Sequence, residues 1–283
     1  MFTTRFAPSP TGLLHLGHIY AAHQARAKAH DSGGKFLIRL EDIDPQRCRD
    51  EYAKSIIEDL TWLGLTPDAS IRSQSQHLAE YAATLEALRE KDLLYPCFCS
   101  RAAIAREAAA SAHAPHAPDG APIYPGTCRD LPPSEAAARI ANHAPHLFRL
   151  NMRRALACLP ANGANLQYFE QSDGWCPCTP DIFGDVVLAR REIPASYHLC
   201  VTHDDALQNI TLVTRGTDLR PATSIHRLLQ EILKYPAPQY AHHPLLTAPN
   251  GQRLAKRDRA QTIASLRAGG LTPSEILALA TPK

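Results

Sequence analysis

Residues 5–18 read RFAPSPTGLLHLGH, and this stretch decides the fold that the sequence predicts. The end of a short strand is followed by a turn rich in proline and glycine, and then by a helix that opens with His15 and His18. A helix that starts directly after a strand presents backbone N–H groups and the positive end of its dipole, which suits phosphate. Both imidazoles share one helical face, and Gly17 leaves room between them for a nucleotide base. The stretch therefore predicts a site that holds ATP for attack at its α-phosphorus. Read alone, HLGH would fit equally a turn and an ordinary helix with two solvated histidines.

The residues around this stretch predict an α/β sheet. Residues 2–6 and 35–40 are expected as strands, separated by a helix over 14–30 that Gly33 and Gly34 end. A strand–helix–strand order favours parallel strands joined by crossover helices. Such sheets bind nucleotides at the carboxyl ends of their strands, where residues 5–18 lie. Further helices are expected over 50–63, 76–91 and 219–235, and further strands over 185–190, 196–202 and 210–215.

The predicted fold class is α/β, with a doubly wound, parallel, Rossmann-like nucleotide-binding domain. Residues 1–94 are expected to form its first half and residues 183–240 its second half. Residues 95–182 are interpreted as an insertion, because a stretch rich in Ala, His and Pro and a group of antiparallel strands interrupt the α/β pattern. Residues 241–283 are expected to hold a basic loop and short C-terminal helices.

The composition is that of a soluble globular protein, with 45% hydrophobic and 20% charged residues. The first residues lack the basic start and apolar run of a secretory signal, and no apolar stretch is long enough to span a bilayer. We therefore expect a cytoplasmic location and no membrane partner. Because the net charge is only +2, any RNA contact must come from local patches. The candidates are Arg149, Arg153 and Arg154, and the basic residues of 253–259.

Residues 5–18 resemble a signature of the class I glutamyl- and glutaminyl-tRNA synthetases. A second match comprises SYHL at 196–199, two aspartates at 204–205 and TRGTDL at 214–219. The resemblance implies an ATP site at His15, Gly17 and His18. It also implies an amino-acid site that includes the segment Arg5, Phe6, Ala7, Pro8 and Ser9.

The resemblance further implies a pocket for L-glutamate that Glu41, Tyr197 and Arg215 complete. Glu41 follows the second predicted strand, where a carboxylate can pair with the substrate ammonium group; an acidic turn capping the next helix is the alternative. A guanidinium fork binds a carboxylate through two hydrogen bonds, so Arg215 and Arg5 are candidates for the substrate carboxylates. Two arginines and one glutamate fit glutamate better than glutamine, whose amide would face a guanidinium.

The basic loop 251–258 occupies the place of the family's second ATP motif, the KMSKS loop. Lys256 matches a motif lysine, whereas several of its neighbours depart from the family pattern. A cationic loop stabilises charge on the departing pyrophosphate, so the resemblance implies a catalytic role for Lys256 beside His15 and His18. Mg²⁺ is expected with ATP on chemical grounds.

Eight cysteines in a chain expected in the cytoplasm favour metal binding or free thiols over disulfides. One branch of the family has a Cys-x-Cys pair followed by Tyr-x-x-x-Cys, and this chain repeats that pattern with Cys97, Cys99, Tyr124 and Cys128. The resemblance implies one structural Zn²⁺ held by these four residues. Alternatives for the fourth ligand are His113, His116, Cys176 and Cys178.

With these cysteines, the chain resembles the glutamyl-Q tRNA(Asp) synthetase branch. Members of that branch activate glutamate with ATP without needing tRNA, and then transfer it to the queuosine at the wobble position of tRNA(Asp). Too few residues follow Lys256 for an anticodon-binding domain, so we expect a catalytic domain alone, acting as a monomer. The alternatives are a truncated glutamyl-tRNA synthetase that charges a tRNA 3′ end, a small-molecule adenylyltransferase, and a non-catalytic descendant that binds an amino acid or tRNA.

Overall fold

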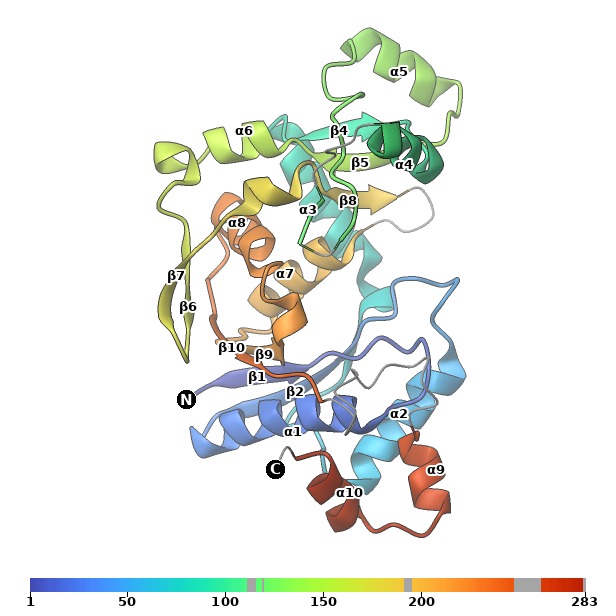
Figure 1. The fold of residues 1–283 in the computed structure, drawn as a ribbon, viewed down its shortest axis with the longest axis vertical. Coiled ribbons are helices and arrows are strands. Elements are labelled where there is room, and N and C mark those ends of the chain that lie inside the picture. Colours follow the sequence, from blue (N-terminus) through green and yellow to red (C-terminus); the bar gives the residue numbers. More distant parts are fainter. Residues whose placement is uncertain (111–115, 119, 191–194, 247–260, 282–283) are drawn as a thin grey trace.

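Residues 7–15 join strand β1 (Thr3–Phe6) to helix α1 (Leu16–Asp31) (Figure 1). The structure is a computed structural model, and it describes residues 1–110, 116–118, 120–190, 195–246 and 261–281. Helix α1 buries a row of small residues, Ala22, Ala25 and Ala29, so that it packs close to β1. The hydroxyl of Thr4 in β1 donates to the carbonyl of Ala25 over 2.7 Å, which fixes the helix on the strand.

The strands are β1 (Thr3–Phe6), β2 (Lys35–Leu40), β3 (Arg72–Ser73), β4 (Leu94–Cys97), β5 (Leu147–Leu150), β6 (Gln167–Glu170), β7 (Gly174–Pro177), β8 (Val187–Arg190), β9 (Leu212–Gly216) and β10 (Gln239–His243). The α-helices are α1 (Leu16–Asp31), α2 (Asp50–Trp62), α3 (Leu78–Glu90), α4 (Arg101–Ala110), α5 (Pro133–Ala141), α6 (Met152–Ala157), α7 (Tyr197–Leu207), α8 (Thr223–Leu233), α9 (Ile263–Ala268) and α10 (Pro273–Leu279). Short 3₁₀ turns are η1 (Gln74–His77), η2 (Pro160–Gly163), η3 (Pro180–Phe183) and η4 (Thr217–Leu219).

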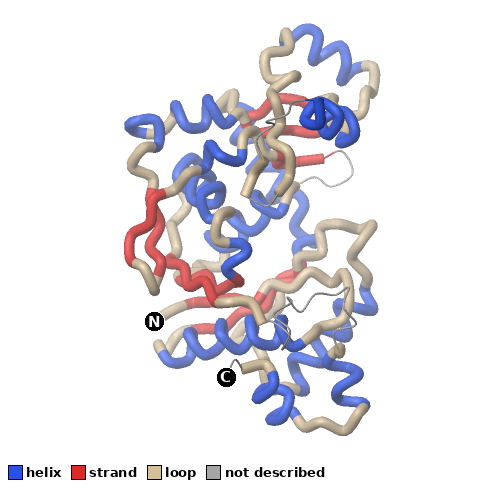
Figure 2. The backbone as a smooth tube through the Cα atoms, in the orientation of Figure 1, coloured by secondary structure: helices blue, strands red, loops and turns tan. Residues whose placement is uncertain are grey.

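Two groups of strands adjoin to form the central layer of the molecule (Figure 2). Strands β1, β2 and β3 run parallel, as do β9, β10 and β6. The groups meet beside β1, where the N–H of Thr211 donates to the carbonyl of Thr3 over 3.0 Å. Helices α1 and α2 lie on one side of this layer and α7 and α8 on the other (Figure 1). This part of the fold has the doubly wound arrangement that the sequence predicts.

The antiparallel strands expected in the insertion are present, whereas β8, predicted in the second half of the parallel domain, also pairs antiparallel and so departs from the prediction. Strand β7 pairs antiparallel with β6, and β4, β5 and β8 form a separate antiparallel sheet. Only a few residues join β6 to β7, and a connection that short can link antiparallel neighbours alone, since parallel strands need a long crossover.

Residues 196–202 form the start of helix α7 rather than the predicted strand. Val201 and Thr202 favour strands, but Ser196 caps the helix by accepting a hydrogen bond from the N–H of Leu199 over 3.5 Å. Asp204 and Asp205 lie in the last turns of this helix and are buried. Packing of α7 against α8 outweighs the local preference for a strand.

Two hydrophobic clusters lie on either side of the central layer. One joins α1 and α2 to the C-terminal helices through Ile263 and Ile276. The other joins α3, α7 and α8 to β5, with Leu150 and Leu199 among its fully buried members. Within the described residues, no helix combines the length and the apolar character needed to cross a membrane.

Candidate active site and cysteine cluster

His15 and His18 lie together at the start of α1, which begins at Leu16 rather than at residue 14 because His15 is its N-cap. Nδ1 of His15 accepts a hydrogen bond from the N–H of Gly17 (3.1 Å), and Nδ1 of His18 accepts one from the N–H of His15 (3.2 Å). With Nδ1 acting as acceptor, each neutral ring carries its proton on Nε2. The rings stack with centroids 3.7 Å apart, and a Cβ at Gly17 would lie only 3.1 Å from Cε1 of His15. The helix start thus holds two Nε2–H groups side by side.

Asp205 of α7 holds Arg5 and Arg39 in a buried cluster. Its carboxylate accepts hydrogen bonds from Nε (2.9 Å) and Nη2 (3.3 Å) of Arg5, and it forms an ion pair with Arg39 at 2.9 Å. Burial alone would raise the pKa of the Asp205 carboxyl, but the two guanidinium groups hold it below its usual value. Arg5 also donates Nη1 to the carbonyl of Thr214 (3.2 Å). The charge of Arg5 is therefore compensated, and its position is fixed.

Asp204 is the second acidic centre of this cluster. Its fully buried carboxylate accepts hydrogen bonds from Nε of Arg72 (2.9 Å), Nε2 of Gln74 (2.8 Å) and the phenol of Tyr81 (3.0 Å). Nε of Arg39 lies 3.6 Å from it. Burial would lower the pKa of Arg39, yet the surrounding carboxylates raise it, so this guanidinium stays charged although it is fully buried.

Glu41 lies directly after β2 and next to the predicted amino-acid segment. Its N–H donates to the carbonyl of Pro8 over 3.0 Å. It does not cap the following helix, because α2 begins at Asp50 with Arg49 as N-cap. Burial raises the pKa of the Glu41 carboxyl to about 7, although nearby guanidinium groups lower it. Glu41 is thus a carboxyl group that changes charge near neutral pH.

Arg215, in β9, is held by three uncharged acceptors. Nε donates to Nε2 of His242 (3.2 Å), Nη1 to Nδ1 of His226 (3.0 Å) and Nη2 to Oγ1 of Thr223 (2.7 Å). Burial, and then the charge of Arg215, lower the pKa of His242 to about 4 and that of His226 well below its usual value. Both rings are therefore neutral at pH 7. Within the described part of the chain, no carboxylate forms an ion pair with Arg215, in contrast to Arg5.

The residues that hold Arg215 were missed by the sequence analysis. They come from α8 and β10, and none belongs to a recognised motif. His242 is followed by a second histidine, and this pair is the only mark in the sequence. Glu170 of β6, whose carboxylate bonds to His242, was missed as well.

Tyr197 opens α7 within electrostatic reach of Arg215, Glu41 and Arg5. Burial raises the pKa of its phenol, Arg215 and Arg5 lower it, and Glu41 raises it. A cavity of about 500 Å³ begins here. Its wall includes Ser9, Glu41, Tyr197 and His198, and also Tyr124, Arg149 and Asp185.

The remaining residues of the RFAPS segment differ in exposure. Phe6 and Pro8 are buried, and Phe6 belongs to the core around Leu14. Ala7 is half-buried, whereas Ser9 is exposed and borders the cavity. Lys256 lies outside the described residues.

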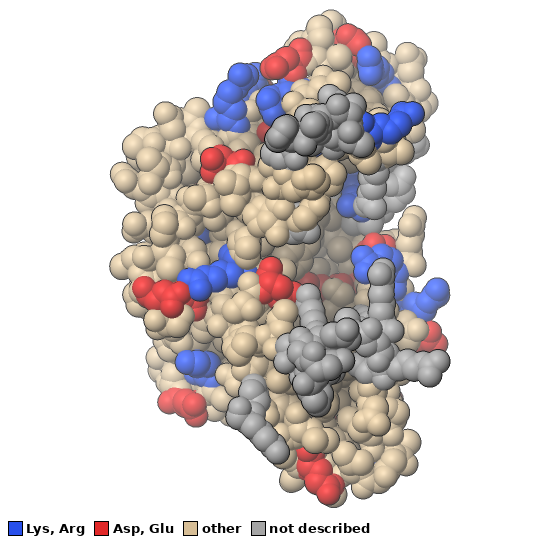
Figure 3. Space-filling view, in the orientation of Figure 1, with Lys and Arg blue, Asp and Glu red and all other residues tan. Residues whose placement is uncertain are grey.

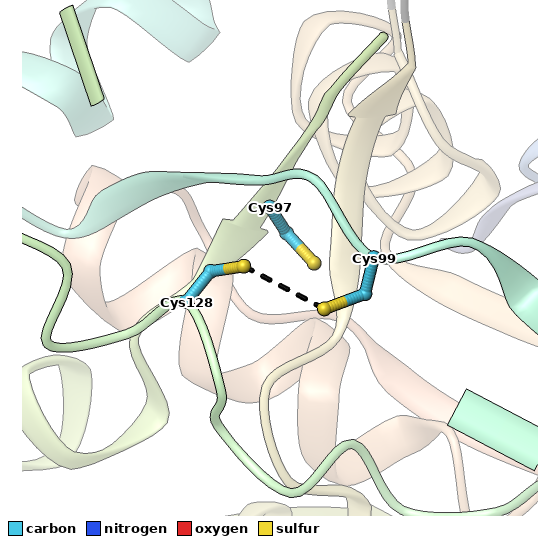
Figure 4. Close-up of side chains that lie close together, drawn as sticks. All are labelled: Cys97, Cys99 and Cys128. Atoms are coloured by element: carbon cyan, nitrogen blue, oxygen red, sulfur yellow. Dashed lines mark hydrogen bonds between the residues drawn. The ribbon is translucent and has the colours of Figure 1, made fainter. Parts of the chain in front are cut away.

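Cys97, Cys99 and Cys128 converge on one point (Figure 4). Their sulfur atoms lie within 4.8 Å of one another, and those of Cys99 and Cys128 are 3.6 Å apart. Sulfurs bound to one tetrahedral Zn²⁺ at 2.3 Å would be roughly 3.8 Å apart. The hydroxyl of Tyr124 lies 3.5 Å from Sγ of Cys99 and accepts from the N–H of Cys128 at 2.8 Å. The three thiols could thus hold a metal ion, with the phenol beside them.

The alternative fourth ligands that the structure describes, Cys176, Cys178 and His116, do not join this cluster. Cys176 and Cys178 pack against Tyr168, and Nη2 of Arg220 lies 3.6 Å from Sγ of Cys176. Among the residues that the structure describes, only the three cysteines group as metal ligands. His113 lies outside the described residues, and His116 is exposed.

The described surface carries no single basic field on the face drawn in Figure 3, where Lys and Arg alternate with Asp and Glu. Arg149, predicted as part of a surface patch, is instead buried. Its Nη1 donates to the carbonyl of Asp185 (2.7 Å), and its guanidinium lies 3.9 Å from the centre of the Tyr124 ring. Arg153 and Arg154 remain candidates for contact with RNA.

Comparison with known proteins places this geometry in context. Residues 1–280 match the family described as tRNA synthetases class I (E and Q), catalytic domain. The glutamyl-Q tRNA(Asp) synthetase of Rhodobacter capsulatus is 44% identical over 282 residues, which cover 96% of this chain and 97% of the relative. That of Nocardia farcinica is 41% identical over 277 residues, which cover 98% of this chain and 83% of the relative.

A solved structure shares the fold. The crystal structure of a glutamate tRNA ligase from Elizabethkingia meningosepticum, in complex with its amino acid, is similar to this chain with a TM-score of 0.75 and 28% identity. The match covers 91% of this chain and 52% of that protein, so the chain spans about half the length of the solved ligase.

Replacement of Asp204 tests the buried charge cluster. Asp204→Asn should lower the free energy of unfolding by about 3–5 kcal/mol, because it removes a buried carboxylate that pairs with both Arg39 and Arg72. Glu86→Gln is the matched control: Glu86 pairs only with Arg89 on the surface, and the change should cost less than about 1 kcal/mol. Urea unfolding of both variants measures the difference. Equal, small losses would contradict the importance of the cluster.

Proposed function

Because the chain belongs to the class I glutamyl- and glutaminyl-tRNA synthetase family of ligases, we propose that it activates L-glutamate with ATP and transfers the glutamyl group to the queuosine at the wobble position of tRNA(Asp). The observation that carries this proposal is a group of charges that act on one side chain: the buried Arg5 and Arg215 and the carboxyl of Glu41 all influence the phenol of Tyr197, and Glu41 and Tyr197 line the cavity. Arg215 offers an uncompensated charge to one substrate carboxylate, Arg5 offers its remaining N–H donors to the other, and Glu41 offers a carboxylate to the ammonium group. The names of the relatives support the choice of acceptor.

Within this pocket, we assign the substrate carboxylates to Arg215 and Arg5 and the ammonium group to Glu41. Arg215 is surrounded by uncharged acceptors, so its positive charge remains available to an anion. A buried charge that lacks a partner is costly, and binding of a carboxylate supplies the partner. Glutamine offers a neutral amide in the same place, which favours glutamate by the charge interaction alone.

ATP is assigned to the start of α1. The two Nε2–H groups of His15 and His18 can donate to phosphate oxygens, and the helix terminus adds its dipole and backbone N–H groups. The described residues flanking 247–260 contact this region, since His243 packs against Tyr20 and Thr262 bridges to His15. These contacts support a role for Lys256 at the departing pyrophosphate. Mg²⁺ accompanies ATP in this proposal.

The reaction then proceeds in two transfers. An oxygen of the glutamate α-carboxylate attacks the α-phosphorus of ATP, the bond to the β,γ-phosphates breaks, and pyrophosphate leaves with the bond electrons. A hydroxyl of queuosine next attacks the activated carbonyl carbon, and AMP departs as the glutamyl ester forms. The protein contributes position and charge rather than covalent chemistry: His15, His18 and Lys256 stabilise the phosphates, while Arg5 and Arg215 orient glutamate.

The acceptor approaches, in this proposal, through the cavity that borders Ser9, Glu41 and Tyr197. The cavity continues to Tyr124 and Arg149, so the space beyond the amino-acid pocket lies against the cysteine cluster. We infer that Cys97, Cys99, Cys128 and Tyr124 bind one structural Zn²⁺, which would fix the wall of this cavity. We assign the catalytic halves to 1–94 and 183–240, the insertion to 95–182, and the ATP loop and C-terminal helices to 241–283. We further propose that the protein is a monomer that binds tRNA in the cytoplasm.

Labelled glutamate tests the proposal. The protein is incubated with ATP, labelled glutamate and tRNA from cells that make queuosine and from cells that lack it, and nuclease mapping locates the label. We expect label in the anticodon loop of tRNA(Asp), only when queuosine is present. Label on a 3′ adenosine would make the protein a minimal glutamyl-tRNA synthetase. No label and no glutamate-dependent exchange of pyrophosphate into ATP would indicate a non-catalytic binding protein.

Arg215→Ala serves as the site control in this experiment. It should abolish glutamate-dependent exchange while the protein remains folded by circular dichroism. Exchange at the wild-type rate in the variant would rule out the assigned pocket. Arg153→Ala, an exposed arginine outside the pocket, should leave exchange unchanged.

The pH dependence of glutamate binding tests the role of Glu41. Only the ionised carboxylate attracts an ammonium group, and the pKa of Glu41 is about 7. Protonation therefore weakens binding as the pH falls, and we expect the KM for glutamate in the exchange reaction to be about tenfold higher near pH 6 than near pH 8. Glu41→Gln should raise this KM and remove its pH dependence. A KM for glutamate that is constant across this range would contradict the assignment.

Metal analysis tests the zinc site. We expect about one Zn²⁺ per chain in the purified protein, lost in Cys128→Ser together with thermal stability. Cys158→Ser is the matched control, because Cys158 is exposed and lies outside the cluster. Tyr124→Phe should bind Zn²⁺ more weakly if the phenol is a ligand. Wild-type protein without zinc, isolated from zinc-supplemented cells, would show that the cluster is a group of free thiols.

A further inference from the structure

Glu170 connects the predicted insertion to the amino-acid pocket. It lies at the end of β6, which pairs in parallel with β10. Its side chain is 1% exposed, yet it forms no ion pair with an arginine or lysine among the described residues. Instead, both carboxylate oxygens accept from His242: Oε1 from the backbone N–H (3.0 Å) and Oε2 from Nδ1 of the ring (2.6 Å).

This contact fixes the tautomer of His242. A carboxylate only accepts, so Nδ1 of His242 must carry the ring proton. The neutral ring then presents Nε2 as an acceptor, and Nε of Arg215 donates to it over 3.2 Å. The opposite tautomer would place an N–H against the N–H of Arg215, and the hydrogen bond would be lost.

We propose that Glu170 is a positioning residue for substrate binding, acting through His242 to hold Arg215 in place while leaving its charge uncompensated. The proposal rests on the proposed function, in which Arg215 binds a carboxylate of glutamate. A carboxylate placed directly on Arg215 would hold the guanidinium equally well but would neutralise it, as Asp205 does with Arg5. The imidazole of His242 lies between the two charged groups. It therefore orients the guanidinium of Arg215 without direct contact between that guanidinium and the carboxylate of Glu170.

The arrangement around Arg215 supports this reading. Its other acceptors, His226 and Thr223, are also uncharged, so all three contacts orient the group without cancelling its charge. The tautomer of His226 is fixed in the same way. Its Nδ1 accepts from Arg215, so its Nε2 carries the ring proton and donates to Nδ1 of His198 (3.1 Å). Among the residues with described positions, Glu170 is the acid that bonds to this set, through His242, and it comes from a strand far from Arg215 in sequence.

Isosteric substitutions test the proposal. In Glu170→Gln, the new amide can donate to Nδ1 of His242, which moves the ring proton to Nε2 and against Arg215. We expect the KM for glutamate to rise about tenfold to a hundredfold, the loss of one hydrogen bond to a charged group, while the KM for ATP changes less than about twofold. His242→Leu should have the same effect. His242→Gln can donate to Glu170 and accept from Arg215, and should restore the KM for glutamate to within about fivefold of wild type.

A matched control and the fold itself are measured in parallel. Gln171→Ala changes the next residue of the same hairpin, whose side chain contacts Lys28 and Gln239 instead, and should leave both KM values unchanged. Thermal unfolding shows which variants are folded; should Glu170→Gln fail to fold, the two His242 variants carry the test. A merely structural role for Glu170 would lower the melting temperature without a selective rise in the KM for glutamate.

The outcomes separate this proposal from the proposed function. Folded Glu170→Gln and His242→Leu proteins with a wild-type KM for glutamate would overturn it, provided that Arg215→Ala abolishes exchange. Wild-type exchange in Arg215→Ala would instead overturn the pocket assignment on which it rests. A selective rise in the KM for glutamate that His242→Gln reverses would establish the positioning role.

Discussion

Charge buried beside the central strands is the constraint on which this structure depends. Arg5 and Arg39 lie inside the protein, where an isolated guanidinium group would be strongly destabilising. Two consecutive aspartates of α7 compensate them, and this ties β1 and β2 to a helix that is distant in sequence. The same contacts fix two residues of the proposed amino-acid pocket, because Arg5 is bonded to Asp205 and Glu41 lies near Arg39.

The two arginines of the proposed pocket differ in how far their charge is compensated. Arg5 carries its own counterion, whereas Arg215 has only neutral hydrogen-bond partners. The charge of Arg215 has no counterion among the described residues, so the site favours binding of an anion. Burial strengthens that preference, because the interaction of a guanidinium with a carboxylate is less screened inside the protein than in water. In the proposed function, this uncompensated charge selects a substrate with a carboxylate side chain.

The predicted insertion contributes residues both to the contacts around Arg215 and to the wall of the cavity. Strand β6 extends the layer formed by β9 and β10, so that Glu170 reaches the residues around Arg215. Farther along the cavity, Arg149 stacks on the ring of Tyr124 beside the three converging cysteines. The predicted insertion thus contributes Tyr124 and Arg149 to the wall of the cavity, and in our proposal its Glu170 positions Arg215.

The sequence by itself determined the family, the α/β order of the first elements and the motif residues, because RFAPSPTGLLHLGH, the Cys-x-Cys pair and RGTDL are local patterns whose chemistry can be read without a fold. It misassigned residues 196–202 as a strand, since the burial that favours a helix there comes from α8. It also did not assign Glu170 or His242 to the site. Their roles exist only because β6 and β10 become neighbours, and a contact between strands separated by a long stretch of chain leaves no local pattern. The tertiary structure alone decided which residues hold the arginines, because compensation of buried charge depends on distance in space and not on distance along the chain.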